Sequence, residues 1–294
     1  MVIEMIANNG NNSTENIMRL ASRFGYNAPQ LRSASPLEDS QIMQVAPSIF
    51  ATDKHGSRSD RYTYIPTIEV LNGLRKNGFQ PFMVAQTRVR DEGKREHTKH
   101  MIRLRHADQI NGAEANEIIL LNSHDGSSSY QMLAGQFRFV CCNGLVCGQT
   151  MGEVRVPHKG NIVENVLQGA FDVLDGFDLI RESTDAMKSV TLDRGEQQAL
   201  ATAALELKYE PTVLKPAPVT AESALMARRF EDRKDDLYTT FNRLQENLVQ
   251  RGGLRARTAS GRNTTTRPVE GIDQNIKLNR ALWVLAEEMR KLKG

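Results

Sequence analysis

The sequence lacks the long hydrophobic runs that mark membrane proteins. No apolar run approaches the roughly 18 residues that a spanning helix requires. The amino-terminal stretch carries Glu4 and has no basic region followed by a long apolar core, which argues against a secretion signal. We therefore expect a cytoplasmic protein with no membrane segment.

Cysteine is scarce and clustered, with three cysteines, all in the stretch RFVCCNGLVCGQT. Three clustered cysteines do not form the series of spaced pairs that is typical of disulfide-bonded proteins. If Asn143 and Gly144 form a two-residue hairpin turn, Cys142 and Cys147 share a face at a distance too long for a disulfide, and Cys141 points away. A metal would need further ligands. We favour small packed side chains, with a metal or redox site as the alternative.

Common catalytic motifs are also absent: the chain has no Walker-type loop, no dinucleotide-binding glycine fingerprint and no His-Glu-x-x-His. Ser123, His124 and Asp125 are consecutive, and neighbours on a strand point to opposite faces, so these three do not form a relay by themselves. His97 and His100 face apart in the strand that we expect. We predict no enzyme activity, no metal and no cofactor, with a hydrolase or nuclease using His124 and Asp125 as an alternative.

The residues that are present are typical of a globular protein, with 39% hydrophobic and 25% charged residues. Periodicity predicts an α+β fold: an antiparallel β-hairpin and sheet packed on helices, then a helical C-terminal region. We expect three parts. They are a partly ordered region 1–60, an α+β core domain 61–181, and a helical region 182–294 with a proline-rich linker at about 209–219.

Individual elements follow from local patterns. Apolar residues at helical spacing predict helices at 65–78, 160–177, 192–207, 220–252 and around 278–292. Alternating residues predict strands at 82–90, 97–107, 116–124 and 136–148.

Arginines are concentrated in the first predicted hairpin. Arg88 and Arg90 alternate with apolar residues on one strand, and Arg103 and Arg105 do so on the next. We expect these four side chains on the solvent face. Like charges across a hairpin repel each other, so this arrangement of arginines favours a bound anion. The alternative is that the four arginines are ordinary solvated side chains with no ligand.

A second basic segment, residues 251–267, reads RGGLRARTASGRNTTTR and contains no acid. Its apolar content is low, so we expect a flexible loop in which Arg255, Arg257 and Arg262 contact phosphates. A solvated surface loop with no ligand is the alternative.

The stretch LLNSHDGSSSYQMLAGQFRFVCCNGLVCG resembles the signature of the phage- and plasmid-like proteins grouped as domain of unknown function 932. In that signature an nShdGs turn precedes R-x-V-C-x-N-G-L. Arg138, Cys141, Asn143 and Gly144 match the second motif. The resemblance covers about residues 60 to 180 and implies a mobile genetic element, without implying an activity. Arg138 is a further candidate DNA contact.

The predicted order of helix, basic hairpin, strand and packing helix is also similar to the core of single-strand annealing proteins of the recombination-mediator superfamily. This second resemblance implies backbone binding of DNA in a basic groove and assembly into rings or filaments.

We therefore expect a nonenzymatic protein of a phage, prophage or plasmid that binds and anneals single-stranded DNA during recombination, as a homo-oligomer. Base stacking has few candidates because aromatic residues make up only 6% of the chain. Tyr62, Tyr64 and Phe82 lie near the predicted basic hairpin. The alternative is a protein-binding factor that counters host defence or meets an acidic host partner.

Overall fold

The computed structural model describes residues 30–56, 64, 66–89, 92–111, 113–128, 130–147, 153–156, 162–258 and 260–293. The chain divides into two compact units, each built from several segments. The first comprises Met1–Ala107, Ile119–Gln131 and Arg155–Gln168, and the second comprises Asp108–Ile118, Met132–Val154 and Gly169–Gly294.

The first unit contains the amino-terminal strands and helices. They are β1 (Gln30–Arg32), α2 (Asp39–Val45), a 3₁₀ turn (Pro47–Phe50), α3 (Thr67–Lys76), β2 (Phe79–Gln86) and β3 (His100–His106). Pro66 precedes α3, and Gly78 follows it with a φ of 86°, a conformation that glycine adopts without strain. The predicted helix at 65–78 is therefore confirmed.

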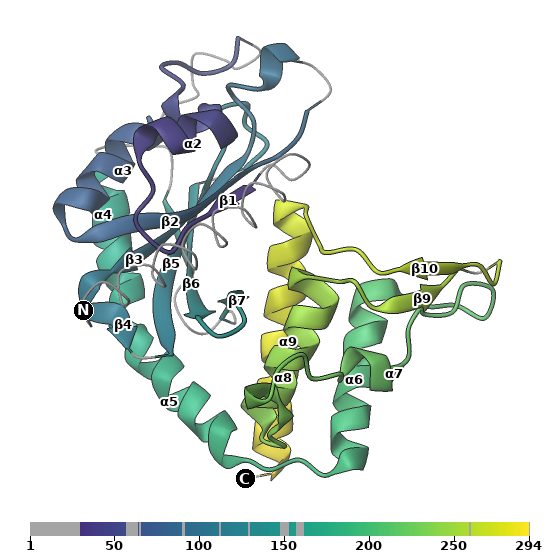
Figure 1. Ribbon diagram of the computed structural model, residues 1–294. Coiled ribbons are helices and arrows are strands. Elements are labelled where there is room, and N and C mark those ends of the chain that lie inside the picture. The colour runs from purple at the N-terminus through teal and green to yellow at the C-terminus, as the bar shows by residue number, and fades with distance from the viewer. Residues whose placement is uncertain are drawn as a thin grey trace, which may run out of the picture. The chain divides into compact units, whose positions relative to one another are not determined.

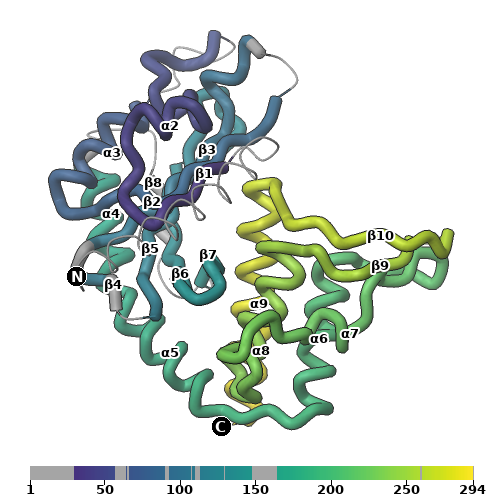
Figure 2. The backbone as a smooth tube through the Cα atoms, viewed as in Figure 1, coloured from purple at the N-terminus to yellow at the C-terminus, as the bar shows by residue number. Residues whose placement is uncertain are grey.

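Strands β2 and β3 form the predicted antiparallel hairpin, with Gln86 opposite His100 and Phe79 opposite His106. A register shift lies between Pro81 and Met83. Proline has no N–H to donate to the ladder, and such residues occur at irregular positions of a sheet. Figure 2 shows β1 beside β2, and the two strands are antiparallel.

The sheet continues through strands that contribute to both units. Its order is β1-β2-β3-β5-β6-β7. The further strands are β4 (Ile110–Asn111), β5 (Glu114–Asn122), β6 (Tyr130–Arg138), β7 (Asn143–Val146) and β8 (Glu153–Val156), with β4 paired to β5 and β8 to β6. The sheet and the helices that accompany it make the fold α+β, as the sequence predicted.

Most of the second unit is helical (Figure 1). After α4 (Ile162–Asp175), which begins in the first unit, come α5 (Phe177–Ser189), α6 (Arg194–Tyr209), α7 (Ala221–Ala224), a 3₁₀ turn (Glu231–Arg233), α8 (Leu237–Gln245), a π-helical turn (Glu246–Gln250) and α9 (Ile272–Lys293). A two-stranded hairpin of β9 (Arg255–Arg257) and β10 (Asn263–Thr265) lies between the π-helical turn and α9. None of the described helices combines the length and apolar character that crossing a bilayer requires.

The single long helix predicted for 220–252 is wrong. Thr220 does cap a helix, since its hydroxyl accepts a hydrogen bond from the Ser223 N–H, but that helix ends at Ala224. The next helix starts only where Asp236 accepts a hydrogen bond from the Thr239 N–H at 2.7 Å. Charged residues between the two helices form tertiary ion pairs, and these override the local helix preference.

Candidate functional site

The segment 251–267 is an ordered β-hairpin, which corrects the prediction of a flexible loop. Arg257 pairs with Asn263, and Arg255 pairs with Thr265. In Figure 1 the hairpin crosses the C-terminal end of α6, and its turn projects beyond that helix. We call residues 251–267 the arginine hairpin.

Alternation along β9 separates the charged side chains from the apolar one. Arg255 and Arg257 are exposed, whereas Ala256 between them is 6% exposed. Successive side chains of a strand point to opposite faces, so the two arginines share one face. They project into solvent, and Ala256 packs against the rest of the unit.

Two glycines make the path of the arginine hairpin possible. Gly261 has a φ of 78° in the turn, where Thr258 and Arg262 exchange hydrogen bonds. Gly252 has a φ of 60°, and a Cβ atom there would lie 2.7 Å from the Thr266 carbonyl oxygen. A larger residue at either position would be strained.

Five arginines of the hairpin are exposed: Arg251, Arg255, Arg257, Arg262 and Arg267. Arg251 forms an ion pair with Glu246, with 2.9 Å between Nε and Oε1. The other four form no ion pair within the part of the chain that the structure describes, and no acid lies in the segment itself. The surface is therefore an uncompensated concentration of positive charge.

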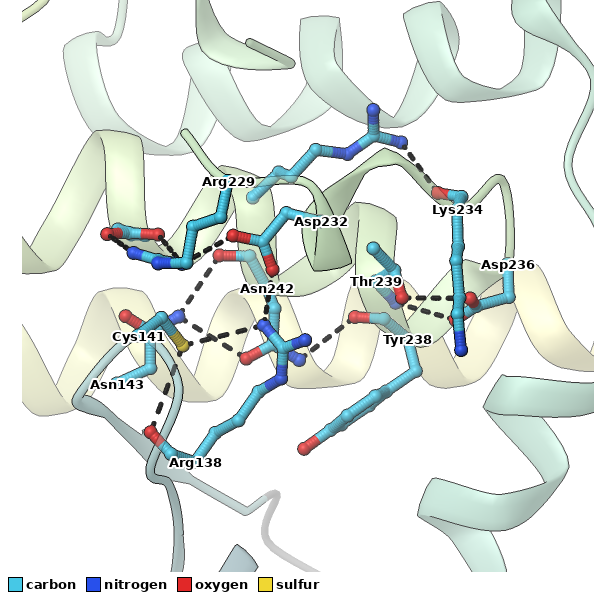
Figure 3. Close-up of polar contacts among 12 residues, drawn as sticks. Arg138, Cys141, Asn143, Arg229, Asp232, Lys234, Asp236, Tyr238, Thr239 and Asn242 are labelled. Carbon is cyan, nitrogen blue, oxygen red and sulfur yellow. Dashed lines mark hydrogen bonds and ion pairs between the residues drawn. The ribbon is translucent and has the colours of Figure 1, made fainter. Parts of the chain in front are cut away.

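A buried network of alternating charges leads to the first residue of this hairpin, and Figure 3 shows its members Arg138, Asp232 and Arg229. Arg138 Nη1 lies 2.7 Å from Asp232 Oδ1, and Arg229 bonds to the other oxygen of the same carboxylate. Arg229 also bonds to Glu246, which pairs with Arg251. The network thus connects the end of β6 to the first residue of the arginine hairpin.

Arg138 is therefore a buried residue and not an exposed DNA contact. Burial alone would lower the pKa of its guanidinium, but the hydrogen bond to Asp232 and the nearby negative charge raise the pKa above its usual value. Removing one partner of a buried ion pair costs about 3–5 kcal/mol because the other charge stays buried. The geometry fits a structural role for Arg138.

The remaining motif residues dock the start of β7 onto α8. Asn143 Nδ2 donates to the Asn242 carbonyl oxygen at 3.1 Å, and Gln245 Nε2 lies 3.5 Å from the Gly144 carbonyl oxygen. Directly after α8, the Arg251 N–H donates to the carbonyl oxygen of Glu246 in a π-helical turn. Such turns frequently occur at functional sites.

The predicted turn at Asn143 and Gly144 is wrong, because β7 begins at Asn143 and pairs with β6 from Arg138. The turn consists of residues 139–142. Consequently Cys141 and Cys147 are buried and Cys142 is exposed. We expected Cys142 and Cys147 on one face and Cys141 on the other, so the positions of Cys141 and Cys142 are exchanged.

The described cysteines are free thiols. Burial raises the pKa of the Cys141 thiol, although Arg138, whose Nη1 lies 3.6 Å from the sulfur, acts in the opposite direction. A raised pKa disfavours the reactive thiolate. Among the described residues, no group of three or more His, Cys, Asp or Glu side chains is placed to hold a metal.

The predicted basic face of the first hairpin is wrong for two of its four residues. Arg88 is exposed, but Arg103 and Arg105 are 2% and 1% exposed. The Arg105 guanidinium lies over the Phe82 ring, 4.3 Å from its centroid. Arg90 lies outside the described residues. The hairpin β2–β3 therefore does not present the expected row of charges.

The first unit also holds a buried polar cluster around Thr67. Its hydroxyl lies 2.9 Å from His100 Nε2 and 3.4 Å from His124 Nε2, and it accepts from Asn122 Nδ2 at 2.9 Å. On the other side of His100, Nδ1 lies 2.8 Å from the Ser48 hydroxyl. Burial, and then the neighbouring His124, lower the pKa of His100 well below its usual value.

The side chains of Ser123 and Asp125 form hydrogen bonds within the turn after β5. The Ser123 hydroxyl accepts from the Ser128 N–H at 2.9 Å, and Asp125 accepts from the Ser127 N–H at 2.9 Å. Both bonds stabilise the turn after β5. His124 is fully buried.

Sequence reasoning missed Asp232 and Glu246, the two carboxylates that hold the arginines of the buried network. No local pattern marks them, because their partners Arg138 and Arg229 are brought to them by the fold. Sequence reasoning did find Arg255, Arg257 and Arg262, and the structure brings these three together on one hairpin.

Comparison with known proteins places the chain in a family. UPF0380 protein YafZ of Escherichia coli K12 is 56% identical over 271 residues, which are 92% of this chain and 97% of the relative. UPF0380 protein YfjQ of the same organism is similar to the same extent. Neither name states an activity.

No solved structure matches the chain. These comparisons do not support the resemblance to single-strand annealing proteins. The model of the family described as domain of unknown function DUF932 matches residues 54–283. Because this match includes most of the chain, the protein belongs to the DUF932 family.

Proposed function

We propose that the protein binds single-stranded DNA through the arginine hairpin and promotes annealing of complementary strands in recombination of a mobile element. One observation carries the proposal: Arg255, Arg257, Arg262 and Arg267 are exposed on one ordered hairpin without ion-pair partners among the described residues. Such a surface favours a polyanion.

The proposed mechanism is electrostatic. Side chains two residues apart on a strand repeat about every 6.6–6.8 Å, so Arg255 and Arg257 reach separate phosphates. Each neutralised phosphate releases counterions, and the bases stay available for pairing. The buried network beneath Arg251 fixes the position of the hairpin, so that little ordering is needed on binding.

The test is a salt-dependent titration of labelled single strands with the full chain and with Arg255→Gln/Arg257→Gln/Arg262→Gln. On a plot of log affinity against log salt concentration, each phosphate contact contributes about −0.7 to the slope. The triple variant lacks three contacts, so its slope should be less steep by about 2. Arg194→Gln is the matched control, because Arg194 is exposed at the other end of α6, where its side chain pairs with Glu222. Its slope should equal that of the unmodified chain.

Annealing is measured as the rate at which two complementary labelled strands pair. The unmodified chain should accelerate pairing, and the triple variant should not. The proposal includes self-association of the protein, because annealing brings together two copies that each carry a strand. Light scattering with and without a strand measures the size of the assembly. If the unmodified chain fails to bind single strands at low salt, the proposal is wrong.

A second candidate is a protein-binding factor that counters host defence. Val213 and Leu214 support it, because they are 101% and 90% exposed in the turn between Pro211 and Pro216. Apolar side chains exposed together mark interaction surfaces more often than isolated ones do. This candidate is favoured if the chain binds no oligonucleotide.

A further inference from the structure

A cavity of about 250 Å³ lies at the base of the arginine hairpin. Its walls come from the end of α6 (Lys208 and Tyr209), from Pro218, and from the hairpin itself (Ala256, Thr264 and Arg267). The Arg257 N–H donates to the Pro218 carbonyl oxygen at 3.0 Å and holds these parts together. Sites for drug-sized ligands begin at about 300 Å³, so this cavity suits a single ring system.

Tyr209 gives the cavity an aromatic wall with a polar group. Its hydroxyl is buried, and no described residue forms a hydrogen bond with it. This hydroxyl is inaccessible to solvent, so it supplies no donor to the cavity. Pro218 and Ala256 add apolar surface, so the cavity combines an aromatic side chain with apolar contacts.

Lys208 adds a positive charge at the same place. Its ammonium group donates to the carbonyl oxygens of Leu248 and Arg267, and an ammonium has three hydrogens to donate. Burial lowers the pKa of Lys208 to about 8, so the group is still mostly charged at neutral pH. Such an ammonium can donate a further hydrogen bond to a carbonyl or anionic oxygen.

The surroundings of the cavity favour an anionic chain. Arg267 lines the cavity, whereas Arg255 and Arg257 lie on the opposite face of β9 from Ala256, whose side chain forms one wall. A molecule that inserts a ring into the cavity while Arg267 contacts its anionic group carries a phosphate next to a heterocycle, and a longer chain of such units also reaches Arg255 and Arg257 on the other face of the hairpin. A nucleotide within a single strand has this chemistry.

We propose that the cavity binds one nucleobase of the strand whose phosphates the arginine hairpin holds. The base stacks on Tyr209, and its carbonyl oxygen accepts from Lys208. This inference rests on the proposed function and names where a base is held. It also supplies the aromatic contact that the sequence did not identify, since Phe82 is buried beneath Arg105.

The experiment compares two strands, an oligothymidine and an oligomer of equal length made of abasic sugar-phosphate. Each is titrated with the unmodified chain and with Tyr209→Leu. The substitution should weaken binding of oligothymidine about 5- to 150-fold, the range that loss of one base–aromatic stack produces. Binding of the abasic strand should not change. The salt slope should be the same for both proteins, because the phosphate contacts remain.

Ala256→Leu provides a second variant that keeps Tyr209 and fills the cavity. It should weaken binding of oligothymidine in the same way, and it keeps the test valid if thermal melting shows that Tyr209→Leu does not fold. If both folded variants bind oligothymidine as tightly as the unmodified chain, the base pocket is wrong while DNA binding stands. If no strand binds at low salt, the proposed function itself is wrong.

Photocrosslinking tests the position directly. A strand with one 4-thiothymidine, irradiated with the unmodified chain, should crosslink to residues of the cavity, Tyr209 or Pro218. Crosslinks found only on other segments would overturn the inference.

Discussion

The hairpins β2–β3 and β9–β10 each contain a strand with two arginines separated by one residue. On β3 these are Arg103 and Arg105, and both are buried. On β9 they are Arg255 and Arg257, and both are exposed. The residue between each pair is apolar and buried: Leu104 is 0% exposed and Ala256 is 6% exposed.

The difference lies in what surrounds each strand. Strand β3 has β2 on one side and β5 on the other, and both of its faces are covered. Strand β9 has only β10 as a partner among the described strands, and one of its faces is open to solvent. The same alternating pattern therefore identifies a strand in both cases without showing which face meets water. The arginines on β3 are buried, and those on β9 are candidates for binding.

The largest expected effect concerns the buried member of this comparison. Arg105→Ala should lower the free energy of unfolding by about 2–4 kcal/mol, because the side chain packs on Phe82 and its loss leaves a cavity. Urea unfolding measures the change. Arg88→Ala is the matched control, since Arg88 is exposed just beyond β2, and it should change stability by less than about 0.5 kcal/mol. Equal effects at the two positions would break the comparison.

The next effect is a pH dependence that also originates on β3. The pKa of His100 in the folded chain is well below the usual value of 6.5. The neutral form is therefore favoured by folding. Above pH 6.5 both states are neutral, whereas below it the unfolded chain takes up the proton first, so stability falls as the pH decreases.

For His100 alone this loss is on the order of 1 kcal/mol between pH 7.5 and 5.5. Urea unfolding at the two pH values measures it. In His100→Gln the dependence should be smaller by this amount, because glutamine does not titrate. A variant with the same pH dependence as the unmodified chain would show that His100 is protonated as easily in the folded state as in the unfolded one.

Much of the fold could be predicted because strongly periodic segments form the same element in any context. The helices at 67–76, 194–209 and 272–293 have clear apolar stripes, and Asp193 begins one of them with a capping box to Glu196. The break in the predicted helix 220–252 was missed, although Asp236 followed by Thr239 is a start signal that the sequence shows.

The candidate site was less predictable because it depends on tertiary contacts. Asn143 and Gly144 are a common turn pair, yet Asn143 begins a strand, and its side chain bonds to Asn242, far along the chain. The arginine hairpin was read as a loop because it has few apolar residues. Its arginines could be identified from charge alone, whereas the cavity beside Tyr209 could not, since its walls come from three separate segments.

The smallest expected effect concerns the exposed member of the comparison. Arg255→Ala should change the free energy of unfolding by less than about 0.5 kcal/mol, because the side chain is exposed and forms no ion pair with any described residue. Urea unfolding measures the change, and Ala256→Asp is the contrasting variant. Ala256, the residue between Arg255 and Arg257 in the sequence, is buried, so an unpaired carboxylate there should destabilise the chain several times as much. A large loss in Arg255→Ala would mean that the arginines of β9 pack as those of β3 do. The two hairpins would then differ in exposure without differing in role.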